Sequence, residues 1–179
     1  DLGLMGLIVP EAYGGLGLSM TAYARVMEMI AGRDASVAIH IGWHQSIGMK
    51  ALLLHGSEEQ KQKWLPRCAT GELVCAYALT EAEAGSDLAG LSTTAVKSGD
   101  GWELSGQKLW IHNAPVADFA LVLARTDPAA GHRGISAFVV EATSPGFSVG
   151  KLEHKMGVRG SPTGEVVLEI AGRARAGPF

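Results

Sequence analysis

The sequence predicts an α+β fold, with a helical domain over residues 1–72 followed by a small antiparallel β-barrel or sandwich over residues 73–170. Apolar residues recur at helical spacing up to about residue 55. From residue 72 onward, short apolar runs alternate with Gly, Asp, Pro and Ser. The 179 residues suffice for one domain or two small ones, so both parts can hold a core.

The helical part contains three predicted helices. The first begins after the N-cap Ser19, places Tyr23, Val26, Met27 and Ile30 on one side, and ends at Gly32. The second, over residues 35–55, is apolar almost all round, which predicts burial on several sides. The third starts at the capping box Ser57–Gln60 and is expected to end near Pro66.

The second part is predicted to consist of short strands. The strand-like runs are Val74–Leu79, Ser92–Lys97, Trp102–Leu104, Leu109–His112, Phe119–Ala124, Ile135–Val140 and Glu165–Ile170. Between two of them, the run Ser98–Gly101 is typical of a hairpin turn. Several short strands at this spacing favour an antiparallel barrel or sandwich over a parallel α/β sheet.

Charge and composition restrict the possible functions. Fifteen basic and eighteen acidic residues give a net charge of −3 without a basic cluster, so neither nucleic acid nor membrane insertion is expected. No apolar run reaches transmembrane length, and no signal peptide is visible. Because the chain starts at Asp1 rather than Met, the genuine N-terminus can lie upstream. Cys68 and Cys75 match no metal or redox spacing, which favours reduced structural thiols over one disulfide.

Several well-known site patterns are missing from the sequence. It has no Gly-x-Gly-x-x-Gly run, no phosphate-binding Gly-Lys-Ser/Thr loop and no Gly-x-Ser-x-Gly elbow. His40 and His44 stand four apart, but Ile41 occupies the place where a metalloprotease carries its Glu. No metal site is therefore predicted, and Ser86 is interpreted as a hydrogen-bond donor rather than a nucleophile.

Two runs of residues favour a ligand site. The apolar run Tyr77–Leu79 opens into a polar loop that contains Thr80, Glu81, Gly85, Ser86 and Asp87. Backbone N–H groups and hydroxyls at such an edge suit a phosphate or a flavin ring, although Gly-Ser-Asp also occurs in ordinary turns. The second run, Gln107–Asn113, surrounds Trp110 with hydrogen-bonding side chains, although a strand Trp is also compatible with a core position. Together the two runs favour a flavin site.

At these segments the sequence resembles the acyl-CoA dehydrogenase family of flavoproteins. The matching segments are Gly6–Gly17, Gly56–Pro66, Thr70–Glu72, Tyr77–Asp87, Gly106–Asn113 and Lys155–Ser161. The resemblance implies an N-terminal helical domain, a middle β-domain and a C-terminal four-helix domain, of which this chain would contain the first two.

The resemblance also implies which residues bind FAD. The implied cofactor-binding residues are Tyr77, Leu79, Thr80, Gly85, Ser86, Trp110, Ile111 and His112. Thr80 would hydrogen-bond the isoalloxazine edge, Trp110 would pack against the flavin, and His112 would approach its reactive edge. Gly85 and Ser86 would lie near the pyrophosphate and the acyl-CoA, with Ser86 contacting substrate as well.

Two positions depart from the family pattern. The family usually carries Pro where this chain has Ala82, so the loop is expected to be less rigid. It usually carries Thr or Ser where this chain has His112, whose imidazole is larger and can titrate. Ala38 stands where the glutaryl-CoA branch carries Arg, which disfavours a dicarboxylic substrate.

The implied reaction is α,β-desaturation of an acyl-CoA thioester by a homotetramer that passes electrons to an electron-transferring flavoprotein. The implied compartment is the bacterial cytoplasm or, less favoured, the mitochondrial matrix. In the family a C-terminal Glu removes the α-proton, and this chain stops at Phe179 before that domain, so no catalytic residue is expected here. Residues 171–179 resemble neither a strand nor the family, which suggests a truncation or a frame change. The alternatives are an acyl-CoA oxidase, a flavin monooxygenase or a non-catalytic fragment.

Overall fold

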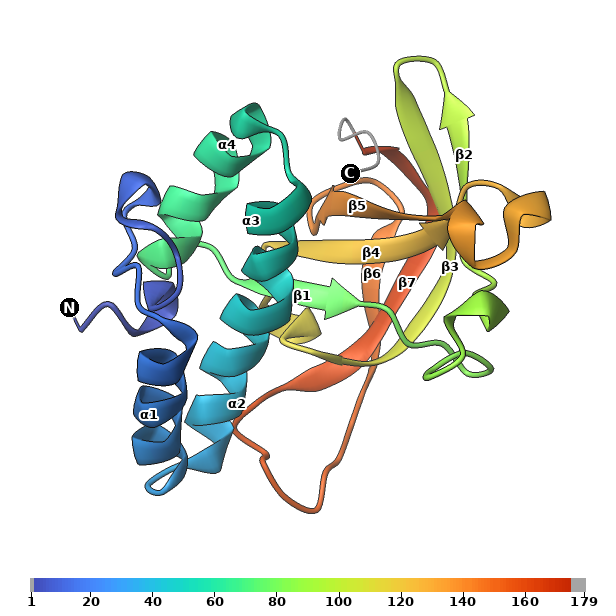
Figure 1. Cartoon of the computed structure of the whole chain (residues 1–179). Helices are drawn as coiled ribbons and strands as arrows, with labels where there is room; N and C mark the ends of the chain where they lie inside the picture. Colours follow the sequence, from blue (N-terminus) through green and yellow to red (C-terminus); the bar gives the residue numbers. More distant parts are fainter. Residues whose placement is uncertain (1, 175–179) are drawn as a thin grey trace.

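The computed structural model describes residues 2–174, and Figure 1 shows the helices gathered along one side of a curled sheet. The helices are α1 Met20–Ala31, α2 Ala35–Trp43, α3 Lys50–His55 and α4 Glu58–Ala69, with a π-helical segment His44–Met49 between α2 and α3. The strands are β1 Cys75–Ala78, β2 Thr94–Ser98, β3 Gly101–His112, β4 Phe119–Arg125, β5 Ile135–Glu141, β6 Phe147–Leu152 and β7 Thr163–Ala174. None of the helices described is long and apolar enough to cross a membrane.

The helix starts follow the predicted capping chemistry. Ser19 Oγ accepts from the N–H of Ala22 at 3.2 Å, and the side chains of Ser57 and Gln60 form a reciprocal capping box. The expected end of the third helix was wrong, because α4 continues past Pro66 to Ala69. Its last turn is buried against the rest of the molecule, and that packing outweighs the hydrogen bond that Pro66 cannot donate.

The sheet is mixed rather than purely antiparallel. Its strand order is β1-β4-β2-β3-β7-β6, with β5 paired to β4. β1 runs parallel to β4, from Cys75 opposite Phe119 onward, while most other pairs are antiparallel. A parallel pair needs a long crossover, which the intervening β2 and β3 supply.

Three strand predictions need correction. The two runs predicted around residues 102 and 112 form one strand, β3, which bends through register shifts against β7. β6 was not predicted, because its side chains are mostly exposed and give little apolar pattern. β7 extends to Ala174, so residues 171–174 do form strand, contrary to expectation. Residues 175–179 of that tail lie outside the described residues.

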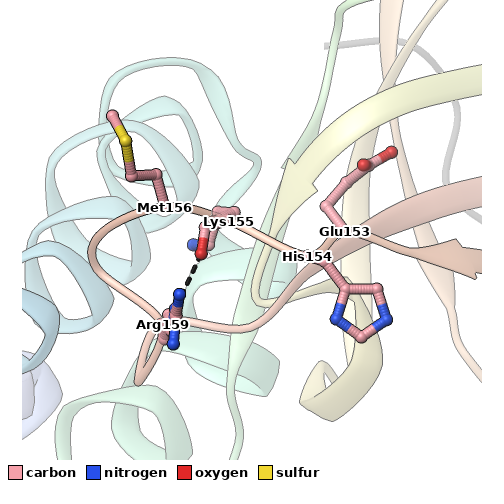
Figure 2. A pocket seen from close by; sticks show the side chains of 5 residues that line it. All are labelled: Glu153, His154, Lys155, Met156 and Arg159. Atoms are coloured by element: carbon pink, nitrogen blue, oxygen red, sulfur yellow. Dashed lines mark hydrogen bonds between the residues drawn. The ribbon is translucent and has the colours of Figure 1, made fainter.

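The connection between β6 and β7 returns to the helical side of the molecule. Figure 2 shows this loop passing beside the helices, and the N–H of Gly160 donates to Ser36 Oγ of α2 at 3.3 Å. A segment near the end of the described chain is thereby tied to the start of α2.

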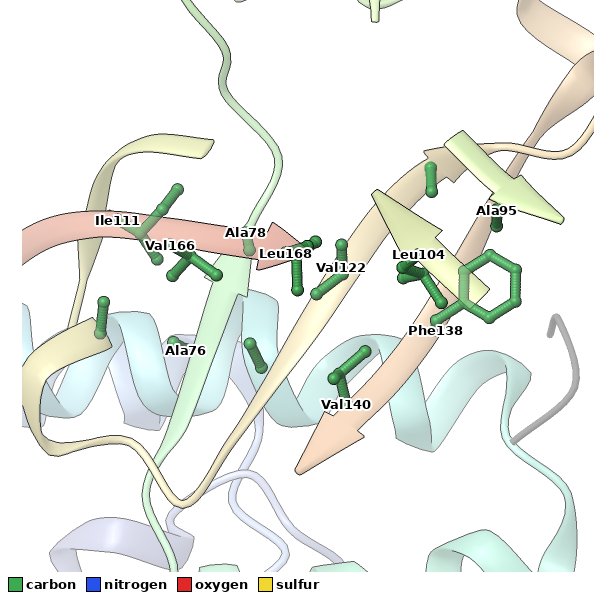
Figure 3. Packing of buried hydrophobic residues seen from close by; sticks show 13 residues of the cluster. Ala76, Ala78, Ala95, Leu104, Ile111, Val122, Phe138, Val140, Val166 and Leu168 are labelled. Atoms are coloured by element: carbon green, nitrogen blue, oxygen red, sulfur yellow. The ribbon is translucent and has the colours of Figure 1, made fainter. Parts of the chain in front are cut away.

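Two apolar cores hold the fold. Figure 3 shows the first, where inward side chains of the strands, such as Leu104, Val122 and Phe138, pack together. The second joins helices to sheet, and its Trp64 and Phe119 rings lie 4.5 Å apart. Because both parts of the chain contribute to this second core, α4 and β4 are packed as one body.

The π-helical segment brings the helices close to β1. A Cβ atom added at Gly48 would lie 2.7 Å from Cys75 Sγ, so glycine is the residue that permits this approach. The π-helical segment interrupts the continuous helix predicted over residues 35–55, and it does so where that helical region meets the sheet.

Candidate functional site

The structure brings together the two runs that the sequence singled out. The N–H of Leu109 on β3 donates to the carbonyl of Thr80 at 2.8 Å. One residue earlier, Lys108 Nζ donates to the carbonyl of Leu79 at 3.0 Å. The chain leaving β1 is thus fastened to β3 beside Trp110, and the predicted flavin-lining segments are neighbours.

A buried ion pair anchors this junction. Lys108 Nζ lies 2.8 Å from Glu81 Oε1, and the two side chains are 0% and 4% exposed. The carboxylate also accepts from the N–H and hydroxyl of Ser92 and from the N–H of Thr93. The loop that carries Glu81, strand β3 and the segment just before β2 therefore meet at this carboxylate.

The same contacts set the charge state of Glu81. Burial raises the pKa of its carboxyl, but the hydrogen bonds from Lys108, Ser92 and Thr93 outweigh burial and lower the pKa to about 2. Burial lowers the pKa of Lys108, and Glu81 opposes that change. Glu81 is therefore ionised at neutral pH and serves as a fixed anchor.

Sequence reasoning missed this ion pair, although a signal for it exists. Leu104 and Lys108 are four residues apart in β3, and both are buried. A Lys at an inward position requires a buried partner, and Glu81 is the only buried carboxylate among the described residues.

Trp110 is turned outward by a bulge in β3. The register against β7 shifts between Lys108 and Ile111, and Trp110 adopts a left-handed backbone conformation with φ of 57°. Trp110 is 57% exposed, while Ile111 is 2% exposed in the sheet core. A left-handed Trp is unfavourable, and such backbone outliers concentrate at functional sites.

The remaining predicted residues differ in what they expose. Tyr77 packs partly against the core shared by helices and sheet, and Thr80 is half-buried. Gly85 and Ser86 are exposed, and the space where a Gly85 side chain would lie is open. Ile111 can reach a ligand only through its main chain, because its side chain is in the core.

His112 lies at the junction of β3 with helix α2. Its ring stacks on Trp43, with centroids 5.0 Å apart and planes 5° from parallel. Its Nδ1 lies 3.1 Å from Ser161 Oγ on the loop before β7. Burial lowers the pKa of His112, and the charge of Lys155 lowers it further.

The two other histidines considered as ligands make unrelated contacts. His40 Nδ1 lies 2.8 Å from Asn113 Oδ1, whereas His44 lies between the carbonyl of Cys68 and the N–H of Cys75. Among residues 2–174, no three His, Cys, Asp or Glu side chains cluster as metal ligands. Cys68 and Cys75 are free and buried, and burial raises the pKa of Cys68 to about 12.

The loop between β6 and β7 encloses a hollow of about 650 Å³ lined by Glu153, His154, Lys155, Met156 and Arg159. Figure 2 shows these side chains diverging, with His154 and Glu153 on the opposite side from Met156. Arg159 Nε donates to the Lys155 carbonyl at 2.8 Å, and Lys155 Nζ donates to Thr163 Oγ1 at 2.9 Å. Lys155 and Arg159 thus hydrogen-bond to the loop and to the start of β7. We therefore do not take this hollow as the candidate site.

The residues around Trp110 fit one side of a flavin. They offer an exposed aromatic face, the half-buried Thr80 and an open loop at Gly85 and Ser86. The turn over residues 81–84 is closed by two backbone hydrogen bonds between Glu81 and Ala84. Together these groups can stack on a planar ring and hydrogen-bond its edge.

Comparison with known proteins identifies the family. The acyl-CoA dehydrogenase N-terminal domain matches residues 1–72, and the acyl-CoA dehydrogenase middle domain matches residues 76–170. The chain belongs to the acyl-CoA dehydrogenase family. It is 43% identical to an acyl-CoA dehydrogenase of Bacillus subtilis over 169 residues, which cover 94% of this chain and 45% of that protein. It is 47% identical to the human mitochondrial very long-chain specific acyl-CoA dehydrogenase over 176 residues, covering 94% of this chain and 27% of the human protein.

Solved structures share this fold. One, described as the electron transferring flavoprotein of Acidaminococcus fermentans, has a TM-score of 0.94 at 40% identity and covers 97% of this chain and 46% of its own. An acyl-CoA dehydrogenase of Bacillus anthracis complexed with FAD has a TM-score of 0.86 at 42% identity, covering 94% and 28%. The chain thus spans less than half the length of these relatives.

Proposed function

We propose that this chain forms the FAD-binding wall of an acyl-CoA dehydrogenase that desaturates acyl-CoA thioesters between the α and β carbons. The observation that carries the proposal is the fastening of the Thr80 loop to β3 beside the outward-turned ring of Trp110. The FAD held by the Bacillus anthracis relative supports the choice of ligand.

On this proposal Trp110 stacks on the flavin, Thr80 hydrogen-bonds its edge, and Ser86 contacts both the cofactor and the acyl-CoA. Tyr77, Leu79, Gly85 and the main chain at Ile111 complete the wall. FAD, when bound, would accept the hydride from the β-carbon of the substrate. The residues of this chain would orient the ring and shield it from water.

The described residues offer no suitable base inside this wall. Desaturation requires a carboxylate that removes the α-proton. Glu81 is adjacent, but its pKa of about 2 and its hydrogen bonds with Lys108 and Ser92 make it a poor proton acceptor. We therefore assign the proton transfer to a Glu outside the described residues, in the C-terminal region that the longer relatives contain.

The proposal also includes the partners expected for a member of this family. An electron-transferring flavoprotein would accept the electrons, and the whole protein would be a homotetramer in the bacterial cytoplasm or, less favoured, the mitochondrial matrix. The likeness to the Acidaminococcus fermentans structure supports the first partner. No nucleic-acid partner is proposed, given the net charge of −3.

Flavin binding tests this proposal directly. When FAD is titrated with the 179-residue chain, its fluorescence should be quenched. The quenching should be stronger with a chain that is completed by the C-terminal part of the Bacillus subtilis relative. Trp110→Ala should raise the Kd for FAD about tenfold, or roughly 1.4 kcal/mol, because the stacking face is lost. The matched control is Ser105→Ala, an exposed change on the same strand.

The completed protein then tests the reaction. An acyl-CoA should bleach the flavin anaerobically, and reoxidation by electron-transferring flavoprotein should be faster than by oxygen. Faster reoxidation by oxygen would instead indicate an oxidase. The proposal fails if neither form binds FAD, or if Trp110→Ala and Ser105→Ala bind it equally.

A further inference from the structure

The side chain of Arg125 binds three backbone carbonyls in two separate loops. Its Nη2 donates to the carbonyl of Ala89 at 2.7 Å, and its Nε donates to the carbonyl of Leu91 at 3.1 Å. Its Nη1 donates to the carbonyl of Gly131 at 3.2 Å. Among the described residues, the guanidinium forms no ion pair with a carboxylate. The side chain therefore holds backbone rather than a counter-charge.

The guanidinium acts from a fixed point of the sheet. Arg125 is the last residue of β4, it is paired with Ile135 of β5, and its own N–H donates to the carbonyl of Thr93 at 2.8 Å. Both loops lie at the end of β4 that points away from the helices (Figure 1). A planar guanidinium offers N–H groups in several fixed directions, which suits three carbonyls better than the ammonium of Lys does.

The first of these loops carries Ser86. A Cβ atom added at Gly90 would lie 3.3 Å from the carbonyl oxygen of Glu83, so the two ends of the loop come close together. Ser86 lies between these ends and is exposed, and its hydroxyl has no hydrogen-bond partner in the part of the chain that the structure describes. The loop thus has a closed base and an open tip that offers a free hydroxyl.

Two fastenings hold the base of this loop. The first is the Glu81 carboxylate, which binds the chain just before β2. The second is Arg125, whose bond to Ala89 is the only hydrogen bond between residues 85–90 and a distant part of the described chain. The other bonds inside the loop are short-range, such as that from the N–H of Ala89 to Asp87 Oδ1 at 3.1 Å. Arg125 is therefore the contact that relates the tip to the sheet.

We propose that Arg125 is a positioning residue for acyl-CoA, which ties Ala89 to the end of β4 and so holds the Ser86 hydroxyl in place before the ligand arrives. This inference rests on the proposed function, in which Ser86 contacts the substrate. A loop that is fixed in advance loses less conformational entropy on binding, so the ligand is held more tightly.

Hydrogen exchange tests the clamp without any ligand. In the 179-residue chain, Arg125→Gln should speed amide exchange at Ala89 and Leu91 about tenfold, while Leu109 on β3 keeps its rate. Arg33→Gln is the matched control, because it makes the same change of charge at an exposed position between α1 and α2, and it should leave all three rates unchanged. Equal rates in the two variants would overturn the positioning role. So would an equal acceleration at Leu109, which would show a general loss of stability.

Binding of coenzyme A then tests what the clamp does. In calorimetry of the 179-residue chain with FAD present, Arg125→Gln should raise the Kd for coenzyme A about tenfold, which corresponds to ordering roughly one residue. Arg33→Gln should leave this Kd unchanged. Arg125→Lys keeps the charge and the side-chain stem, so it serves as the variant that folds if Arg125→Gln does not. It should still bind coenzyme A several-fold more weakly, because it lacks the planar fork.

The outcomes separate this inference from the proposed function. Full rescue of coenzyme A binding by Arg125→Lys would show that the charge matters and the clamp does not. Equal affinity for coenzyme A in Arg125→Gln and Arg33→Gln refutes the positioning role and leaves the flavin function intact. An unaltered chain that binds FAD but not coenzyme A refutes the inference alone, and one that binds neither refutes the proposed function as well.

Discussion

His44 shows how one side chain can join three elements. It begins the π-helical segment, its Nδ1 accepts from the N–H of Cys75 at 3.0 Å, and its Nε2 lies 3.1 Å from the carbonyl of Cys68. Nδ1 must be unprotonated to accept, so the proton is on Nε2 and the ring is neutral. The last turn of α4 and the first residue of β1 are thus held by one imidazole.

Burial gives His44 a strong pH dependence. It lowers the pKa of His44 from 6.5 to about 4, so the unfolded chain binds a proton more readily than the folded one. The free energy of unfolding should therefore be unaffected by His44 above pH 6.5. It should fall by up to about 3 kcal/mol as the pH drops from 6.5 to about 4, and this effect should level off below pH 4.

Urea denaturation at several pH values checks this dependence. His44→Phe should lower stability at neutral pH by roughly 2–4 kcal/mol, because two buried backbone groups lose their partner. It should also flatten the slope between pH 6.5 and 4. The exposed His154→Gln is the control and should keep the slope. An equal slope in His44→Phe would show that other groups cause the acid sensitivity.

At the scale of elements, the decisive contact is the one between the loop after β1 and strand β3. Lys108 and Glu81 supply it, and neither charge is solvated. Removing one partner would leave the other charge buried and unpaired, which costs far more than the net contribution of an intact pair.

Lys108→Met should therefore lower the free energy of unfolding by about 3–5 kcal/mol. It should also speed amide exchange at Leu109, whose N–H binds Thr80. The control is Arg25→Met, which breaks an ion pair with side chains 78% and 70% exposed and should change stability by less than about 1 kcal/mol. Similar losses in both variants, measured by urea unfolding, would contradict the importance of burial.

At the scale of the whole molecule, an apolar groove of about 620 Å³ runs between α1 and α2. Met27, Ile39 and Trp43 are among the residues that line it. Apolar surface of this kind usually belongs to an interface. Because the chain spans only 45% of its Bacillus subtilis relative, surface that faces solvent here can be covered in a longer protein.

The 179-residue chain should accordingly self-associate as its concentration rises, and sedimentation velocity would detect this. Ile39→Glu should shift the population toward monomer, because it places a charge inside the groove. Val96→Glu, at an exposed position on β2, is the matched control and should leave association unchanged. A chain that stays monomeric at every concentration would show that the groove has no role in assembly.

Much of the local structure could be predicted from the sequence because its causes are local. Capping at Ser19 and Ser57 depends on residues within one turn, and both caps formed as predicted. The end of α4 beyond Pro66 and the parallel pairing of β1 depend on distant packing, so patterns of spacing could not reveal them. The exposed strand β6 carries almost no apolar signal.

In the candidate site, too, some features follow from the local sequence and others only from the fold. The runs around Thr80 and Trp110 were recognisable, and their contact follows from the fold. The bulge that turns Trp110 outward and the stack of His112 on Trp43 require the partner strand and helix α2. Residue types alone therefore indicate where the candidate site lies but not how its side chains are held in position.

The place of β4 in the sheet bears on how the chain is synthesised. β1 ends at Ala78, and its neighbour β4 is complete only at Arg125. At about 5–20 residues per second, the ribosome needs several seconds to make that stretch. During this interval β1 has an unpaired edge of the kind that attracts other strands. Thr80 follows β1 closely, so the candidate flavin wall adjoins a strand whose partner β4 is made later.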